Sequence, residues 1–597
     1  MRKPLTRPLR IYAFDPTLGR RFGNHMTVNV PDEDLRPGPR GYSIEVIDYD
    51  ATRQRYYEPV DLDQQEVLLQ GGLAPSEADP RFHQQMVYAV ARKTLENFAA
   101  ALGRNVEWTR RRPGSTPRRP RPLRIYPHAM QEANAYYDAG RHALLFGYFA
   151  ATRTDAGANL PGQTVFTCLS HDIIAHETTH ALVHDIRQGF MQPTNPDTLA
   201  FHEAFADLVA LFQHFSFREA LEDHILRTGG VLSDPDLRPI LDFRGARREA
   251  APGARPITLA EEAQRNVLVG LAQQFGEAMG RRAALREALG TPPQPEELER
   301  RYEPHERGAV LVAAVFDAFF TVYSHRMADL LRIAGVSAGA TGGELGVDLA
   351  RRLAAEAAKT AKHFVNMCIR ALDYCPPVDI TFGDFLRALL TADCDLVPDD
   401  DLGYRDILIE AFRRRGIRPS GVTSYSESSL LWQPAEGRGG RPLVCEGLDF
   451  DVIWGTEGKV QRKNARVLGR FARTHADRLG FKRGLPIQPW TFHPVHRVGP
   501  DGQLGFQIVV ELLQRRSEPL DPRRKSSPTF DYHGGTTLIL DARSEEVTYA
   551  IFKRVASRNR LDRQRAFWAE ARLYGVDPYG PGEVGPRADF AVTHRGY

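Results

Sequence analysis

The sequence predicts an α+β fold, because strand-like and helix-like patterns occupy different parts of the chain. Near the N-terminus apolar and polar residues alternate, as they do in half-buried strands. From about Cys168 to residue 418, apolar residues recur every three or four positions, which is typical of helices. Strand-like runs return after Ser420. We therefore expect sheets at both ends of the chain and helices between them.

The size and composition are those of a globular protein. The chain has 597 residues, enough for three or four domains, with 42% hydrophobic and 26% charged residues. The net charge of +3 argues neither for nor against nucleic acid, and we expect no nucleic-acid partner. No secretory signal and no membrane-spanning run is evident, so no membrane association is expected. The five cysteines are odd in number and form no CxxC pair, which predicts free thiols and a cytoplasmic protein.

The first 190 residues are expected to form two parts. Residues 1–75 are a β-rich N-terminal region, and residues 76–190 are an α/β lobe. Within this lobe, 82–102 has helical spacing and ends at Gly103, a residue type common at helix C-termini. The arginine- and proline-rich stretch 110–122 is predicted to be a solvated loop. The runs PLRIYP and HALLFGYFA that follow it are predicted strands.

Residues 191–418 are expected to form a helical lobe. Gly189, Gly335 and Gly416 lie where predicted helices end, and the glycine-rich stretch 335–346 is a predicted loop without the features of a phosphate-binding loop. Helical spacing, beginning just before this lobe, covers 170–187, 197–216, 258–280, 309–333, 346–373, 382–393 and 403–415.

The last part of the chain, residues 419–597, is predicted to be a further α+β domain whose role the sequence does not indicate. Strand-like alternation appears at 505–514 and again at 536–553. The second run contains the polar stretch ARSEE between two alternating segments, which predicts a β-hairpin.

The strongest functional signal is the sequence His-Glu-Thr-Thr-His at 176–180. Its segment has helical spacing, and residues four apart project from the same face of a helix. His176 and His180 can therefore hold one metal ion between them, and Glu177 can face a water on that ion. The pattern predicts a zinc site with Glu177 as the base that activates water.

A third ligand is predicted on the next helix. Glu203 follows His180 by 23 positions, and Asp207 lies one turn further along the same face. Both carboxylates stand among large apolar residues, where an unpaired charge is costly. We expect Glu203 to bind the metal and Asp207 to accept the other ring N–H of a ligand histidine. Position 186 is isoleucine, which excludes the zinc-protease class with a third histidine there.

Other histidines near this motif receive less specific interpretations. His184 lies one turn beyond His180 and is a rival ligand, although Glu203 completes the set better. His202 precedes Glu203 but points about 100° away on the helix, so we expect it beside the site or at the surface. Cys375 and Cys394 are expected to be buried thiols rather than ligands.

The combination HETTH and HEAFAD resembles the gluzincin metallopeptidases, especially the thermolysin and fungalysin groups. The resemblance covers about residues 75–415 and implies a thermolysin-like, two-lobed fold, a Zn²⁺ cofactor and a peptide or protein substrate. The segment EANAYYDAGRHALLFGYF is similar to the edge strand that holds substrate in these enzymes, which implies substrate contacts for Asn134 and Ala135. In EPHERGAVLVAAVFDAFF the resemblance makes His305 the residue that stabilises the transition state, and in a later helix it places Arg387 toward substrate.

The sequence also departs from these groups. Their known enzymes are typically secreted with an inhibitory propeptide and bind structural calcium, and neither a signal, an obvious prodomain nor dense acidic loops are evident here. A tyrosine partner for the oxyanion is not identifiable. Three functions therefore stay open: a zinc peptidase, another hydrolase on the same scaffold such as an amidase or epoxide hydrolase, and a non-catalytic zinc protein whose C-terminal domain binds a partner.

Overall fold

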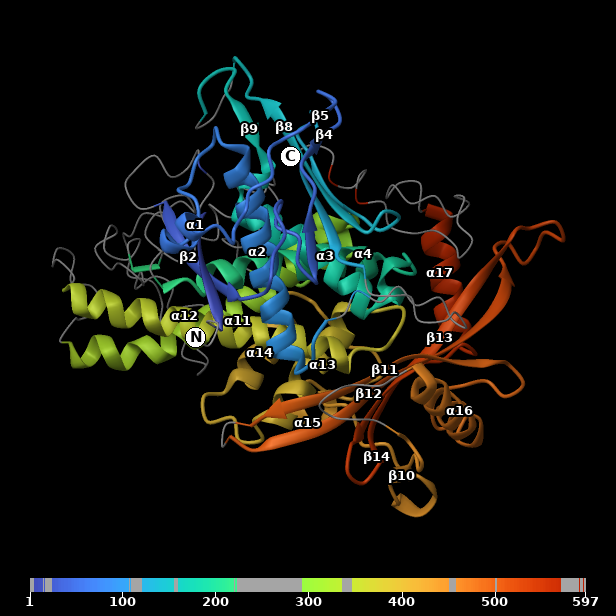
Figure 1. Ribbon diagram of the computed structural model, residues 1–597. Helices are drawn as coiled ribbons and strands as arrows, with labels where there is room; N and C mark the ends of the chain where they lie inside the picture. The colour runs from blue at the N-terminus through green and yellow to red at the C-terminus, as the bar shows by residue number, and fades with distance from the viewer. Residues whose placement is uncertain are drawn as a thin grey trace.

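The protein has an α+β fold, as the sequence predicts (Figure 1). The computed structural model describes residues 5–13, 16, 24–106, 108, 121–154, 159–218, 221–222, 293–334, 346–449, 458–499 and 502–570, together with Phe590 and His594. The predicted helix 258–280 and most of the predicted loops 110–122 and 335–346 lie outside these residues.

The N-terminal part is built from short sheets around one long helix. Strands β1 (Thr6–Tyr12) and β2 (His25–Pro31) form an antiparallel pair, and β4 (Tyr49–Asp50) pairs with β5 (Arg55–Tyr56). A larger sheet has the order β3-β6-β8-β7, and β9 extends from β8. Its strands are β3 (Ile44–Val46), β6 (Leu123–Met130), β7 (Ala135–Asp138), β8 (Ala143–Ala150) and β9 (Thr164–Phe166). The predicted strands PLRIYP and HALLFGYFA are thereby confirmed, and β7 is an edge strand of this sheet.

The helix predicted over 82–102 is α2 (Pro80–Leu102), which follows the short helix α1 (Gln65–Leu69). Asp79 accepts a hydrogen bond from the backbone N–H of Arg81 and caps the N-terminus of α2. Gly103 ends the helix with φ of 66°, the left-handed conformation that favours glycine. The capping residues therefore determine both ends of this helix.

Six longer helices form the centre of the molecule and agree with six of the predicted helical segments. The main difference is the start of α11, which lies five residues before the predicted one because Glu303 accepts a hydrogen bond from Glu306 N and Pro304 occupies the first turn. The six are α3 (His171–Ile186), α4 (Pro196–Phe215), α11 (Pro304–Ile333), α12 (Val347–Ala371), α13 (Phe382–Leu396) and α14 (Tyr404–Arg414). Short elements between them are η1 (Thr167–Leu169), η2 (Gln188–Met191), α10 (Glu297–Arg300), η4 (Leu372–Tyr374) and α15 (Glu427–Leu430).

Helix α4 is at the centre of the helical core. It packs against α3, α11 and α12, and it is buried around its whole circumference. Within α11, the window Pro304–Ala328 is long and apolar enough to cross a membrane by length and composition, yet 78% of it is buried inside the protein. All five cysteines are free, as predicted, although Cys394 is only partly buried.

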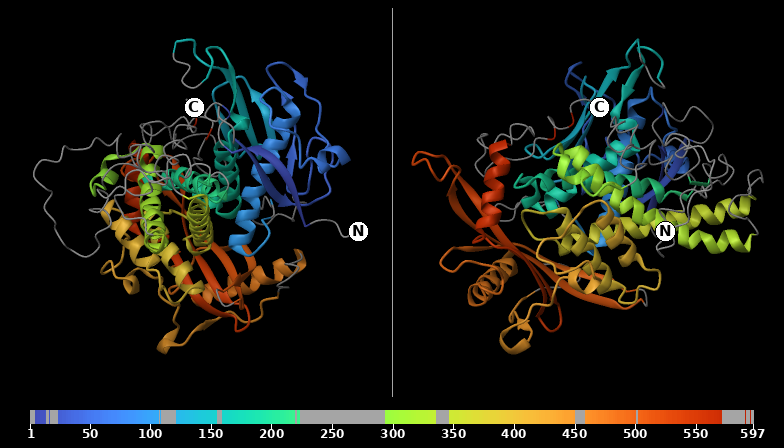
Figure 2. Two further views of the ribbon diagram at one scale, coloured as in Figure 1. Left: turned by 90° about the vertical axis from the view of Figure 1, so that its left-hand side faces the viewer. Right: turned by 180° about the vertical axis from the view of Figure 1, so that it is seen from behind.

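The C-terminal part contains a five-stranded antiparallel sheet of order β10-β14-β13-β12-β11. Figure 2 shows this sheet, in orange to red, between helix α16 and the helical core. The predicted hairpin is confirmed as β13 and β14. The elements are β10 (Leu443–Val444), α16 (Gly458–Thr474), β11 (Ile487–Val498), β12 (Leu504–Pro519), β13 (Thr529–Asp541), β14 (Glu546–Lys553) and α17 (Arg558–Glu570), with a short turn η5 (Arg438–Gly440) before β10.

Alternation along the strands gives this sheet two different buried faces. Ile508, Val510 and Leu512 of β12 pack in one apolar cluster with Leu468 and Phe471 of α16. The other face is turned toward the helical core, where Ile539 and Ile551 join the main hydrophobic cluster of the molecule. Because successive side chains of a strand point to opposite faces, one sheet can cover α16 and the core together.

Buried ion pairs also connect this sheet to the helical core. Arg187, which ends α3, bonds to Glu511 of β12 and to the carbonyl of Leu372. The carboxylate of Asp373 accepts hydrogen bonds from Arg104 at 2.7 Å and from Arg497 of β11 at 2.9 Å. The helix that carries the HETTH sequence is therefore held at its C-terminal end by the C-terminal sheet.

The Asp373 carboxylate predicts an acid-sensitive contribution to stability. Burial alone would raise its pKa, but Arg104 and Arg497 hold the pKa well below its ordinary value. The folded state therefore binds this proton less readily than the unfolded state, so the stabilisation is present above the unfolded pKa of about 3.9 and is lost as pH falls through the lower folded value. We expect the loss of thermal stability in Asp373→Asn to be largest near pH 7 and to shrink below about pH 4, measured as melting temperature at each pH. The fully exposed Asp348, replaced by Asn, is the control, and a deficit of constant size at every pH would contradict this expectation.

Candidate metal centre

Helix α3 places the two histidines and the glutamate of the HETTH motif in the interior. His176, Glu177 and His180 are all fully buried. The two imidazole rings lie on one face of the helix, with centroids 4.6 Å apart, and their Nε2 atoms face each other at 2.9 Å. The expected pairing of residues four apart is therefore present in the structure.

Helix α4 brings two carboxylates to these rings. Glu203 Oε2 lies 3.4 Å from His176 Nε2 and 3.6 Å from His180 Nε2. Asp207 Oδ1 lies 2.8 Å from His176 Nδ1, the position expected of a carboxylate that orients a ligand histidine. Asn195 caps the start of α4 by accepting from Asp197 N, and α3 packs directly against α4. The packing of these two helices thus brings together residues 23 positions apart.

These atoms fit a bound cation. In a tetrahedral zinc site with bonds of about 2.0 to 2.1 Å, ligand atoms are about 3.3 Å from each other. The distances of Glu203 Oε2 to the two histidines, 3.4 and 3.6 Å, are close to that value. With the proton of His176 on the nitrogen that faces Asp207, its Nε2 is left with a lone pair directed at Glu203 and His180. Converging lone pairs and a carboxylate repel each other unless a proton or a metal cation lies between them.

Electrostatics keep the facing groups in forms suited to metal binding. Burial lowers the pKa of His180 to about 4, so its ring is neutral. Burial alone would raise the pKa of Glu203, but the facing histidines, led by His305 and His594, hold it well below its ordinary value. Neutral imidazoles and an ionised carboxylate are the forms that bind zinc.

His202 lies behind His180, inside the protein rather than at the surface. Its Nδ1 is 3.0 Å from Nδ1 of His180, and the residue is fully buried. If His180 donates through Nδ1, its Nε2 keeps a lone pair toward Glu203, so His202 can orient this ligand in the way Asp207 orients His176. His184 bonds instead to the hydroxyl of Tyr137 at 2.9 Å and is absent from the metal-capable groups among the described residues.

His305 also reaches the site, from the first turn of α11. Its Nε2 lies 3.3 Å from Glu203 Oε2, and its Nδ1 lies 2.7 Å from the carboxylate of Glu303. This approach depends on Gly308, where an added Cβ would be only 2.8 Å from the carbonyl oxygen of Ala200 in α4. The glycine therefore allows α11 to pack closely on α4 and brings His305 to the predicted ligand.

The residues predicted to contact substrate lie at the start of the edge strand β7. Ala135 begins this strand, and Asn134 immediately precedes it. Both are buried, and the Asn134 carbonyl accepts from Gly147 N of β8 at 2.9 Å. The structure gives Arg387 a different surrounding from the predicted one: its guanidinium donates to the carbonyls of Leu430 and Leu431 and covers the ring of Trp432 at 3.8 Å.

The sequence interpretation missed two residues of the site, both from the end of the chain. His594 lies with Nδ1 3.2 Å from Glu177 Oε1 and Nε2 3.3 Å from Glu203 Oε1. Phe590 stacks on the ring of His180 with centroids 4.2 Å apart. Burial opposes the charged form of His594, but Glu177 and Glu203 outweigh it and raise its pKa to about 10 in the absence of a metal, so a metal ion must replace the Nε2 proton before this ring can bind it. No motif spacing links His594 to a helix 391 positions earlier, so no sequence signal indicated it.

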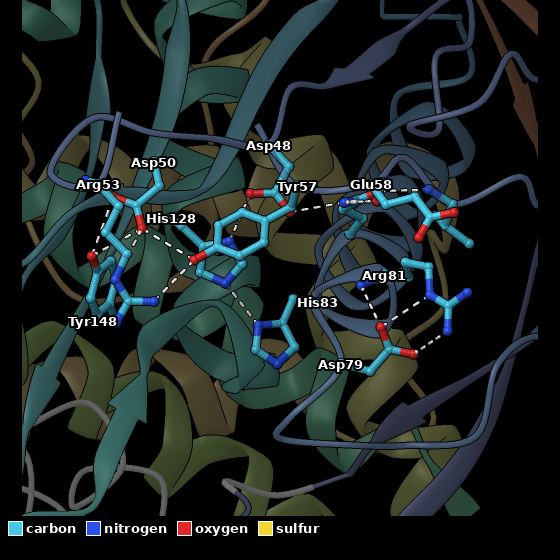
Figure 3. A network of polar contacts seen from close by, with 12 residues as sticks. Asp48, Asp50, Arg53, Tyr57, Glu58, Asp79, Arg81, His83, His128 and Tyr148 are labelled. Atoms are coloured by element: carbon cyan, nitrogen blue, oxygen red, sulfur yellow. Dashed lines mark hydrogen bonds and ion pairs between the residues drawn. The ribbon is translucent and has the colours of Figure 1, made fainter. Parts of the chain in front are cut away.

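A separate polar network lies between α2 and β6 (Figure 3). His128 Nδ1 is 2.7 Å from Asp48 Oδ1, its Nε2 is 2.8 Å from His83 Nδ1, and His83 Nε2 is 3.1 Å from the carbonyl of Glu77. With Cys168, the two histidines also form a metal-capable group. Every ring nitrogen of the two histidines, however, faces a polar partner in a chain that runs between two acceptors, the Asp48 carboxylate and the Glu77 carbonyl, and this chain joins α2 to the sheet.

Comparison of the chain with protein-family models finds no match, and a search of curated proteins finds no related sequence.

Proposed function

We propose that this protein is a zinc-dependent metallopeptidase of the gluzincin type. The observation that carries the proposal is the convergence of His176, His180 and Glu203 on one buried point, at separations that suit tetrahedral zinc. Glu177 on the same helix adds a buried carboxylate beside that point. A thermolysin-like arrangement of two lobes, with α3 in one and α4 in the other, belongs to this proposal.

The roles of the side chains follow from their places. A bound zinc ion supplies a water of pKa about 7 and polarises the scissile carbonyl. Glu177 accepts the proton of the attacking water and later delivers it to the leaving amine. His305 donates a hydrogen bond to the oxyanion, and its contact with Glu303 fixes the ring for this purpose. Asp207 and His202 hold the two ligand imidazoles in orientation.

A peptide is the substrate that the surrounding strands favour. Strand β7 is the edge of its sheet, and an extended peptide can add to such an edge through backbone hydrogen bonds. Ala135 lies at the end of β7 that approaches the metal centre, since its carbonyl is 3.1 Å from the ring of His594. This placement supports the substrate contacts proposed for Asn134 and Ala135. A cytoplasmic location remains part of the proposal.

The metal itself is the first test. We expect about one zinc per purified chain, measured by elemental analysis, and almost none in His176→Ala, because two remaining ligands bind zinc weakly. His325→Ala, at an exposed position of α11, is the matched control and should keep its full zinc content. Chelation should lower the melting temperature of the wild type and leave that of His176→Ala unchanged. A wild-type chain that binds no zinc would end the proposal.

A structural zinc site is the second candidate, and the position of His594 favours it. Four protein ligands leave no open position, which is the arrangement of structural rather than catalytic zinc. In that case the purified chain would still contain about one zinc, but neither the wild type nor any variant would cleave a peptide. The C-terminal sheet would then be the part that binds a partner. Peptide-library cleavage followed by mass spectrometry separates the two candidates.

A further inference from the structure

The end of the chain enters the metal centre beside its three predicted ligands. His594 has only 3% of its surface exposed, and one nitrogen of its ring lies within 4.8 Å of ligand atoms of His176, Glu177 and His180. A second such group joins it to Glu203 and His305. A histidine placed among these atoms is in reach of any ion that they bind.

The two ring nitrogens of His594 face groups of different kinds. Nε2 lies 3.3 Å from both oxygens of Glu203, the separation expected between two ligands of one tetrahedral ion. Nδ1 lies 3.1 Å from the carbonyl oxygen of Ala135 and 3.2 Å from Glu177 Oε1. Histidines that bind metal commonly donate their other ring N–H to a carbonyl or a carboxylate. Both sides of the ring therefore have the partners of a metal ligand.

Phe590 anchors the segment four positions earlier. Its ring stacks on His180 at 4.2 Å with 23° between the planes, and it lies 5.3 Å from His202. Only 3% of its surface is exposed. An apolar side chain thus covers one face of the ring of a predicted ligand.

The chain is long enough to make this contact within one molecule. Trp568 of α17 donates to the carbonyl of Pro193 at 2.5 Å, and Arg560 pairs with Asp379 at 3.2 Å. Helix α17 therefore lies beside the start of α4, the helix that carries Glu203. The 20 positions from Glu570 to Phe590 can span up to about 66 to 72 Å, whereas Glu203 is only about 10 Å along α4 from its start.

We propose that His594 is an internal fourth ligand of the metal and that its side chain, packed with Phe590, holds the enzyme in a latent state. This inference rests on the proposed peptidase function. Three parts of the catalytic machinery would be occupied together. His594 Nε2 would take the coordination position that a water needs. The Nδ1–H of the same ring would contact both the base Glu177 and the carbonyl of Ala135 on the edge strand. A substrate must therefore displace the His594 side chain to reach these groups.

The test compares full-length wild type with His594→Ala and Phe590→Ala. The probe is acetohydroxamate, a small chelator that needs free coordination positions on the metal. We expect each variant to keep one zinc per chain, and His594→Ala to bind the probe at least about ten-fold more tightly, because the wild type can bind the probe only in the fraction of molecules in which the His594 side chain has left the metal. After substitution with Co²⁺, the visible absorption of His594→Ala should differ from that of the wild type, since one nitrogen ligand is exchanged for solvent. Peptide cleavage should rise by a similar factor, and Phe590→Ala should lie between the two. His325→Ala is the control, and it should match the wild type in zinc content, probe affinity, cobalt absorption and peptide cleavage.

Each remaining outcome bears on one proposal. Equal probe affinity and equal cobalt spectra in wild type and His594→Ala would overturn the latency, and so would loss of zinc from His594→Ala, because His594 would then be a structural ligand. Probe affinity that depends on protein concentration would also overturn it, since the segment would come from a second copy. Failure of the proposed function is distinct, because it appears as a wild-type chain without zinc.

Discussion

Replacing Glu177 with glutamine is expected to lower peptide hydrolysis by about 100- to 10,000-fold while the zinc content stays at one per chain. The amide has nearly the shape of the carboxylate but cannot accept the proton of the attacking water. Glu177 is fully buried and is not one of the three predicted ligands, so the substitution leaves the metal site intact. Cleavage of a peptide library and elemental analysis of the same preparation measure both quantities.

The comparison is made in two backgrounds, so that it does not depend on His594. In the unmodified chain the activity of wild type and Glu177→Gln is compared directly, and in the His594→Ala chain the larger rate widens the measurable range. Glu66→Gln, at an exposed position of α1, is the matched control and should keep wild-type activity. Full activity of Glu177→Gln in either background would disprove the proposed mechanism.

Replacing Glu511 with alanine is expected to destabilise the protein by about 3–5 kcal/mol. Glu511 lies on β12 and pairs with Arg187, and both side chains are nearly inaccessible to solvent, at 4% and 2% exposed. Among the described residues, removing the carboxylate leaves the buried guanidinium with the carbonyl of Leu372 and the hydroxyl of Thr537 as hydrogen-bond partners and with the more distant charge of Asp373. The midpoint and slope of urea unfolding measure this loss.

Arg187 also ends helix α3, so the same substitution should weaken the metal centre. We expect Glu511→Ala to release zinc to a chelator faster than the wild type does, because loss of this contact loosens the C-terminal end of the helix that carries both histidines. Asp531→Ala is the control: Asp531 pairs with Arg515 on the same sheet, but the two side chains are 30% and 57% exposed, and such surface pairs contribute about 0 to 1 kcal/mol. Equal destabilisation by the two substitutions would show that the buried pair has no special role.

Much of the local structure was predictable, because it depends on neighbouring residues. The predicted helix 82–102 agrees with α2, because a capping aspartate starts this helix and a glycine in the left-handed conformation ends it. The hairpin at 536–553 agrees with β13 and β14 because a polar turn separates two alternating runs. The start of α11 was placed too late, because Glu303 and Pro304 extend the helix beyond its periodic apolar stretch.

The candidate metal ligands could be predicted from the sequence for a similar reason. His176 and His180 share a helical face by spacing alone, and Glu203 and Asp207 were recognisable as carboxylates that an apolar helix face cannot leave unpaired. The surroundings of Arg387 could not be predicted in this way. Its position in a helix gave no indication that its guanidinium would contact Trp432 and a backbone carbonyl.

The sequence by itself determined the fold class, most helix bounds and which carboxylates accompany the HETTH histidines, because these follow from periodicity and from the cost of burying charge. Only the tertiary structure decided that His305 reaches Glu203 across the close contact at Gly308, that Arg187 binds a strand of the C-terminal sheet, and that His594 lies among the predicted ligands. These contacts join residues separated by about 100 to nearly 400 positions. Their formation depends on how whole helices and strands pack, and the spacing of residues along the sequence does not indicate that packing.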